Sequence, residues 1–308
     1  MLLHVFFTSR KATKFAKTLF FCAFSGYNIN QRKVLQLNCG TIETNGAATE
    51  YFTFGHGSKH LVILPGLSTR SILYAAMSIP SGYRIFSEDY TVWVIDRRAS
   101  MQEHFTVRQM AADIAAAMRG LGIGTADVFG ASLGGMVAQY LAADFPEPVH
   151  ALVLGSTTAR QNPTILRVSV HWAETAENGT LAEHTEEMMR LLYSPATIEK
   201  YGKLLCRVND GLSREELHRF SVQARAISDF NGYAVLDRIH CPTLVIGVEN
   251  DRVVTAEAST EIAEKLGCGC YIYGREYGHC VFDEAPDYKQ RLYDFFQGTW
   301  NTEESSII

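Results

Sequence analysis

The stretch that decides the fold reads DVFGASLGG and covers residues 127–135. A short buried strand is predicted from Asp127 to Phe129, and a helix is predicted to open at Leu133. Glycines two residues before and two residues after Ser132 allow the chain to turn abruptly from strand to helix. Such a turn holds a serine in a strained backbone geometry and projects its hydroxyl above the sheet.

Apolar runs and helical patterns alternate on both sides of this turn. The runs are apolar throughout, as in strands buried on both faces of a parallel sheet. They are residues 60–64, 91–95, 127–129, 151–154, 243–246 and 270–273. Apolar residues recur every three or four positions from Thr106 to Leu121, which predicts an amphipathic helix with Thr106 as its N-cap. The order predicts an α/β fold with a mostly parallel central sheet flanked by helices.

Two earlier strands and two further helices complete the expected core. Residues 34–37 and 50–54 read as strands that flank a turn at Asn45-Gly46. Helices are expected over residues 133–144 and from about Pro286 to Phe296.

The strand pattern stops between about Ser156 and Leu236, where the sequence reads as several helices. Breaks between them are indicated at Pro163, Asn178-Gly179, Pro195 and Asp210-Gly211. A helical block inserted into an α/β core is the layout of a cap over a site. We therefore expect an N-terminal extension (1–32), a core (33–155), a helical cap (156–236), the rest of the core (237–297) and a tail (298–308).

Composition and charge argue against several classes of protein. The 308 residues are 47% hydrophobic and 20% charged, which are ordinary globular values. The net charge is −5 and the isoelectric point is near 6.1, which argues against a nucleic-acid partner. No apolar run reaches the roughly 18 residues needed to cross a bilayer.

The N-terminal segment differs from the rest in charge. Residues 1–42 hold six of the 28 basic residues and none of the 33 acidic ones. With its short apolar stretch from Thr18 to Phe24, this segment could act as a targeting peptide. We expect a non-catalytic extension on a cytoplasmic protein. The seven cysteines are odd in number and lack zinc-site spacing, which predicts reduced thiols.

A serine hydroxyl is a poor nucleophile at neutral pH unless a base and an orienting acid assist it. Asp251 lies in the loop after the strand at 243–246, and His279 lies in the loop after the next strand. Strand ends that meet at one edge of the sheet would bring both side chains to Ser132. The sequence therefore predicts a Ser132–His279–Asp251 triad, with Glu249 as a rival acid in the same loop.

Two backbone amides are candidates for the oxyanion hole. The amide of Leu133 lies at a helix N-terminus, where it can donate to a developing negative charge. The loop Pro65-Gly66-Leu67-Ser68 follows a buried strand. Gly66 allows close backbone approach there, and the amide of Leu67 is the second candidate donor.

From about Gly40 to Gln297, the chain resembles an α/β-hydrolase fold protein with an inserted helical cap. The motifs that carry the resemblance are Leu64-Pro65-Gly66, the Gly130 to Gly134 turn, Pro242 to Gly247 leading to Asp251, and Gly278-His279 followed by Glu284-Ala285-Pro286. The chain departs from the pattern twice. Many relatives have His-Gly at Pro65-Gly66, and an Arg-Gly-x-Gly turn where this chain has residues 96–100, DRRAS.

The serine at position 132 narrows what the resemblance implies. It argues against dehalogenases and epoxide hydrolases of this fold, which use aspartate there. The remaining expectation is a serine hydrolase that needs no cofactor or metal and cleaves a small or medium acyl compound, most simply a carboxylic ester. Alternatives are an acyltransferase or perhydrolase with the same triad, and a non-catalytic ligand receptor.

Other residues carry weaker predictions. Trp172 and Met188 could line a substrate pocket together with Gly66, although the same spacing suits helix packing. Arg160 and Arg167 could bind an anionic substrate or form a solvated helix face. Arg97 and Arg98 could line the mouth of the pocket. Alternatively, they could form an ion pair with Asp96 or Asp89. Cys280 lacks the surroundings of a nucleophile. The sequence does not indicate an oligomeric state.

Overall fold

The computed structural model describes residues 36–300 and places the predicted apolar runs in one sheet. Within these residues, eight strands follow the order β1-β2-β4-β3-β5-β6-β7-β8. The strands β3 to β8 run parallel to one another, and β1 and β2 are antiparallel to their neighbours. The bounds are β1 Asn38–Thr44, β2 Ala47–Phe54, β3 Lys59–Leu64, β4 Tyr90–Ile95, β5 Ala126–Ala131, β6 Val149–Gly155, β7 Thr243–Val248 and β8 Gly269–Tyr273.

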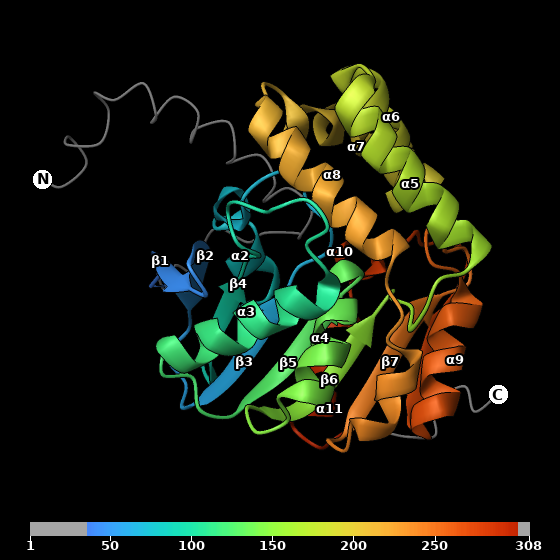
Figure 1. Cartoon of the computed structure of the whole chain (residues 1–308). Helices are drawn as coiled ribbons and strands as arrows, with labels where there is room; N and C mark the ends of the chain where they lie inside the picture. Colours follow the sequence, from blue (N-terminus) through green and yellow to red (C-terminus); the bar gives the residue numbers. More distant parts are fainter. Residues whose placement is uncertain (1–35, 301–308) are drawn as a thin grey trace, which may run out of the picture.

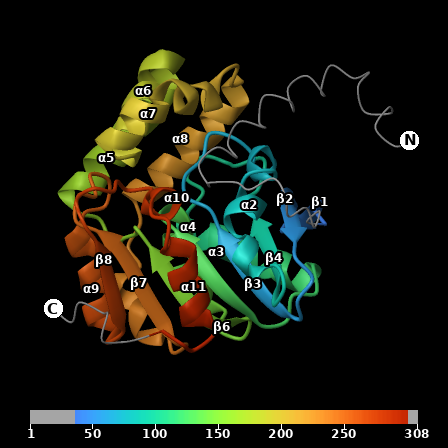
Figure 2. The same ribbon diagram turned by 180° about the vertical axis from the view of Figure 1, so that it is seen from behind.

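Alternate residues of each central strand feed two apolar layers. In β3, Val62 and Leu64 join the layer under the helices α3, α4 and α9, whereas Leu61 and Ile63 join the layer under α11. Figures 1 and 2 show these helices on opposite faces of the sheet. They are α3 Val107–Gly120, α4 Leu133–Asp144, α9 Ala256–Leu266 and α11 Tyr288–Phe296. Burial on both faces explains why the strands are apolar throughout.

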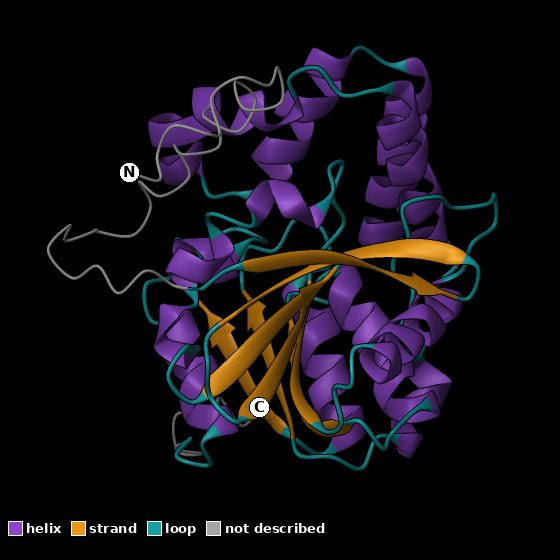
Figure 3. Cartoon of the chain, turned by 90° about the vertical axis from the view of Figure 1, so that its left-hand side faces the viewer, coloured by secondary structure: helices purple, strands orange, loops and turns teal. Residues whose placement is uncertain are grey.

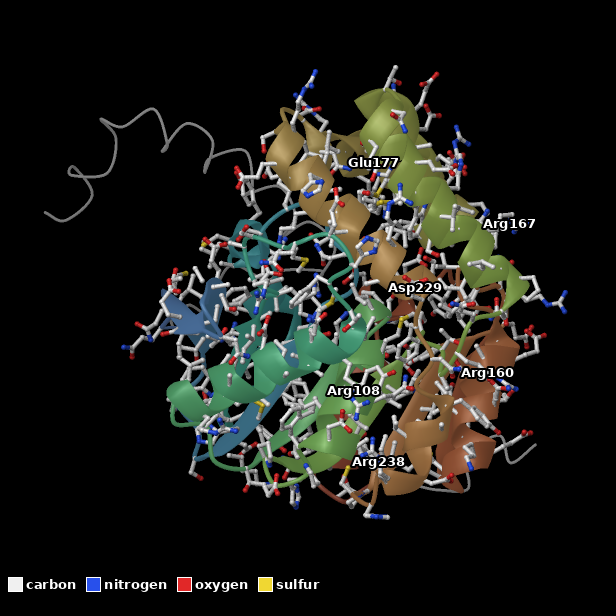
Figure 4. The ribbon with its side chains drawn as sticks, viewed as in Figure 1. Arg108, Arg160, Arg167, Glu177, Asp229 and Arg238 are labelled. Carbon is white, nitrogen blue, oxygen red and sulfur yellow. The ribbon has the colours of Figure 1, made fainter. Side chains whose placement is uncertain are left out.

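The chain leaves the sheet after β6 and returns at β7, and the helices between form a block above the carboxyl end of the sheet (Figures 1 and 3). The helical block comprises α5 Pro163–Asn178, α6 Leu181–Leu192, α7 Pro195–Cys206 and α8 Arg214–Ser228. Two of its helices begin at the predicted prolines. An ion pair of 2.7 Å between Glu177 and Arg225 joins α5 to α8; Figure 4 labels Glu177.

Local sequence signals account for several element boundaries. Thr106 caps α3 and forms a capping box with Gln109, as the N-cap prediction requires. Asn45 and Gly46 both have positive φ, which suits the tight turn between β1 and β2. The closing helix was expected from about Pro286, but α11 begins two residues later, at Tyr288. A separate short helix, α10 (Val281–Glu284), precedes it.

One predicted strand was wrong. Residues 34–37 were expected to form it, but Gln36 and Leu37 lie outside any strand, β1 begins at Asn38, and residues 34 and 35 fall outside the described part. The strand β1 lies at the edge of the sheet and is largely exposed, so it lacks an apolar pattern. Helix α9 was not among the predicted elements.

The N-terminal extension predicted over residues 1–32 lies outside the described residues. Within residues 36–300, no helix is long and apolar enough to cross a membrane. The cysteines among these residues are free thiols.

The close packing at the Ser132 turn can be tested by substitution of Gly134. A Cβ atom at Gly134 would lie 2.0 Å from the carbonyl oxygen of Leu64. We expect Gly134→Ala to lower the free energy of unfolding by more than about 2 kcal/mol because the backbone of β3 cannot yield cheaply. Gly124→Ala is the control, since nothing lies within 4 Å of its Cβ position. Urea unfolding monitored by fluorescence would compare them, and equal midpoints would contradict the packing described here.

Candidate active site

Ser132 lies between β5 and α4 in a backbone conformation that few residues adopt. Its φ is 52° and its ψ is −118°, which is strained for a residue with a side chain. The turn is held by a 2.9 Å hydrogen bond from the Ser132 amide to the Gly155 carbonyl. The Thr157 hydroxyl donates to the Ser132 carbonyl at 2.8 Å. The last residue of β6 and Thr157, two residues beyond it, therefore fix the turn from the side.

His279 lies between Ser132 and Asp251 and contacts both. Its Nε2 is 3.0 Å from Ser132 Oγ, and its Nδ1 is 2.8 Å from Asp251 Oδ2. An ionised carboxylate only accepts hydrogen bonds, so we assign the imidazole proton to Nδ1. The lone pair of Nε2 then faces the Ser132 hydroxyl and can take its proton. The three residues predicted from the sequence are therefore brought together.

Asp251 is held from two sides in a buried position. Its Oδ1 accepts hydrogen bonds from the amides of Val253 and Val254 at 2.8 and 2.9 Å. Burial alone would raise the pKa of Asp251, but interaction with His279 and the two amide bonds outweigh it. The pKa therefore lies below its ordinary value, and the carboxylate stays ionised beside His279 at neutral pH.

The rival residues lie elsewhere or are inert. Glu249 pairs with Arg275 at 2.9 Å on the surface, so Asp251 is the acid that reaches His279. The thiol of Cys280 is buried, and burial raises its pKa well above the ordinary value. A protonated thiol is a weak nucleophile.

Both predicted oxyanion donors belong to backbone near Ser132. Leu133 is the first residue of α4, so its amide has no acceptor within the helix. Gly66 lies against Ser132, because a Cβ atom there would be 3.3 Å from Ser132 Cβ and 4.0 Å from Oγ. Leu67 is the next residue. The absence of a side chain at Gly66 therefore keeps the space in front of the hydroxyl open.

Trp172 of α5 and Met188 of α6 are both buried in the apolar cluster that also contains Leu133. This burial fits the packing of the helical block. The indole Nε1 of Trp172 has no hydrogen-bond partner among the described residues. A buried donor without a partner is costly, so this N–H is a candidate contact for a bound molecule.

The four arginines considered in the sequence divide into two groups. Arg160 pairs with Glu261, and Arg167 is exposed and points away from α5, as Figure 4 shows. Both fit a solvated face. Arg97 lies 3.8 Å from Asp96, and Arg98 binds Asp113 rather than Asp89.

Two residues that carry no predicted role tie the loops that hold Asp251 and His279 to the helical block. Glu284 accepts from the Gly278 amide at 2.6 Å and from the Ser194 hydroxyl at 2.6 Å. Arg252, next to Asp251, donates to the Tyr193 carbonyl at 3.0 Å. Glu284 belongs to a motif visible in the sequence, but its partner Ser194 is 90 positions away and no local signal pairs them.

Comparison with known proteins identifies the fold family of the chain. The model of the alpha/beta hydrolase fold family matches residues 59–286, which is more than half of the chain. The chain belongs to the α/β-hydrolase fold family.

Relatives of this α/β-hydrolase have several names. The chain is 27% identical over 216 residues to RutD of Escherichia coli O81 (strain ED1a), which is named as a candidate carbamate hydrolase. The match covers 66% of this chain and 79% of that protein. The chain is 21% identical over 234 residues to 3-oxoadipate enol-lactonase 2 of Acinetobacter baylyi, covering 73% and 84%. A solved esterase from Thermogutta terrifontis matches with a TM-score of 0.69 at 20% identity, covering 86% and 100%. At this identity, the structural match shows the fold alone.

The lowered pKa of Asp251 predicts how stability depends on pH. Its folded pKa lies below the unfolded value of about 3.9, so its stabilising contribution is full above that value and is lost as pH falls through the folded pKa. We expect Asp251→Asn to flatten the fall in the free energy of unfolding below about pH 4. Glu249→Gln, which alters a surface pair, should keep the wild-type slope. Urea unfolding at several pH values measures both slopes; an unchanged slope in Asp251→Asn would contradict the assignment.

Proposed function

We propose that this α/β-hydrolase is a serine hydrolase that uses no cofactor and cleaves a small or medium acyl substrate, most simply a carboxylic ester. The observation that carries the proposal is the continuous chain of hydrogen bonds from Ser132 Oγ through His279 to Asp251. These three hydrogen-bonded side chains are buried and lie at the carboxyl edge of a parallel sheet, where this fold presents reactive groups.

The proposed reaction has two halves. His279 Nε2 takes the Ser132 proton as Oγ bonds to the acyl carbon, and the carbonyl oxygen becomes an oxyanion. The amides of Leu67 and Leu133 stabilise that charge. The carbon–oxygen bond then breaks, and protonated His279 gives its proton to the leaving alcohol. Water, deprotonated by His279, attacks the acyl-enzyme, and the acid is released as Ser132 regains its proton.

Asp251 has a supporting role in this proposal. It stays ionised and faces Nδ1, so it stabilises the imidazolium that forms in each half-reaction. The same contact keeps the tautomer in which Nε2 is free to act as a base.

The identity of the substrate is proposed from chemistry and from relatives. The relatives are named as an enol-lactonase, an esterase and a candidate carbamate hydrolase. Lactones, esters and carbamates each contain a carbonyl carbon bonded to oxygen or nitrogen. We propose that residues 156–236 act as a cap that selects the acyl group. Gly66, Trp172 and Met188 would line that pocket.

Removing the nucleophile tests the proposal. We expect Ser132→Ala to reduce ester turnover by about 10⁴-fold or more while the protein stays folded. Ser156→Ala is the matched control, because Ser156 is also a buried serine with positive φ at a strand end, and its hydroxyl has no partner among the described residues.

The measurement is a panel of p-nitrophenyl esters of graded chain length, with a thioester, a lactone, a carbamate and an amide. Unchanged turnover in Ser132→Ala would contradict the assignment. Absence of turnover across the panel in the wild-type protein would favour the receptor alternative. Products formed with methanol or hydrogen peroxide would distinguish hydrolysis from acyl transfer or perhydrolysis.

A second test addresses the proposed pocket. Trp172→Phe keeps the ring but removes the N–H. We expect KM to rise about 5- to 10-fold, the equivalent of one hydrogen bond from that N–H to the substrate, with little change in kcat. Trp93→Phe is the control, because its Nε1 donates to His60 Nδ1 at 3.1 Å on strand β4. An unchanged KM in Trp172→Phe would assign Trp172 to packing alone.

A further inference from the structure

A buried cluster of charges lies behind the loop that carries Leu67. It consists of Asp96, Arg97 and Arg219, of which Asp96 and Arg97 follow β4 and Arg219 comes from α8. Arg97 is only 4% exposed, although it is an arginine. Arginine is rarely buried to this extent unless its donors are used, so its contacts are informative.

The guanidinium of Arg97 holds the oxyanion loop directly. Its Nη1 donates to the Pro65 carbonyl at 2.6 Å, and its Nη2 donates to the Gly66 carbonyl at 2.8 Å. Its Nε donates to the side-chain oxygen of Gln223 on α8, and this third hydrogen bond fixes the orientation of the planar guanidinium group. Three acceptors from two distant parts of the chain therefore set the position of one planar group.

The bond to Gly66 also fixes the direction of the next amide. In a trans peptide, the carbonyl of one residue and the N–H of the next point to opposite sides, and the described residues contain no cis peptide. Because the Gly66 carbonyl points to Arg97, the Leu67 N–H points away from Arg97. Gly66 lies against Ser132, so this N–H belongs to the peptide that borders the serine.

The cluster carries an unbalanced charge. Asp96 binds Arg219 at 2.8 Å and lies 3.8 Å from Arg97, so one carboxylate serves two guanidinium groups. The neighbouring Glu216 pairs with Arg70. Burial lowers the pKa of Arg97 to about 10, and Arg97 remains charged at neutral pH. One buried positive charge is therefore left over behind the loop, where low polarity weakens screening.

We propose that Arg97 is a positioning residue for the oxyanion hole: it holds the Gly66–Leu67 peptide with its N–H toward Ser132 and places an uncompensated positive charge behind the developing oxyanion. The inference rests on the proposed serine hydrolase function. Neither effect acts on the neutral ground state as strongly as on the charged tetrahedral state, so Arg97 should affect the rate more than the binding of substrate.

Lysine cannot replace Arg97 in both respects. An ammonium group retains the charge but lacks the planar fork that reaches the two carbonyls and Gln223 at once. Arg97→Lys therefore tests positioning with the charge retained, and Arg97→Met removes both. Arg98→Met is the matched control, because Arg98 follows in the same loop and binds Asp113 at 2.6 Å without contacting the oxyanion loop.

The test measures how fast a fluorophosphonate probe labels Ser132 in the full chain and what fraction of chains is labelled at completion. We expect the second-order rate to fall about 100-fold in Arg97→Met and about 10-fold in Arg97→Lys, with full final labelling in both. With p-nitrophenyl acetate, kcat should fall while KM changes little. Arg98→Met should stay within about twofold of the wild-type rate.

Each outcome has a separate meaning. A wild-type protein that does not react would overturn the proposed function itself. A reactive wild type with Arg97 variants that label at the same rate would overturn only this inference. A lower labelled fraction at an unchanged rate would also overturn it, because that result describes lost folding rather than lost positioning. If Arg97→Met does not fold, Arg97→Lys decides, since it keeps a cation beside Asp96.

Discussion

The backbone conformation of Ser132 is the constraint on which the site depends. A residue with positive φ between a parallel strand and a helix requires very close packing of the two elements. Gly130 on β5 meets this requirement, because a Cβ atom there would lie 2.5 Å from the carbonyl oxygen of Gly134 on α4, and Gly134 in turn lies against the carbonyl oxygen of Leu64 on the neighbouring strand β3. The same turn lifts the Ser132 hydroxyl toward His279 and leaves the Leu133 amide at the start of α4 without an internal acceptor. One strained turn thus supplies both the proposed nucleophile and a candidate oxyanion donor.

The helical block is bonded to each loop that contributes to the site. Glu284 links the histidine loop to Ser194, and Asn162 donates to the Val254 carbonyl beside the acid loop at 2.9 Å. Gln223 holds Arg97, which in turn holds the oxyanion loop. These contacts come from the block itself, so a change in its helices would move the catalytic loops as well as any pocket. Under the proposed function, residues that select the substrate and residues that react with it would therefore belong to one bonded network.

The sequence predicts the core well, and it names the three residues that the structure brings together at Ser132, because those features have local signals. The glycines around Ser132 and the loops after two buried strands identify Asp251 and His279 without knowledge of the packing. The edge strand β1 was misplaced because exposed residues leave no apolar pattern. The pairing of Arg97 with Asp96 was considered, but its contact with Gln223 was missed, because Gln223 is 126 positions away and only folding brings the two together. Long-range polar contacts of this kind have no signature in a single sequence.

The claim that Ser132 is the nucleophile has one most direct test. The wild-type protein is mixed with p-nitrophenyl acetate, quenched with acid within the first turnover, digested and examined by mass spectrometry. The account predicts an acetyl group on Ser132 that disappears as the reaction is allowed to proceed. Release of p-nitrophenol with the acetyl group on another residue, or with no acetyl-enzyme formed at all, would contradict it.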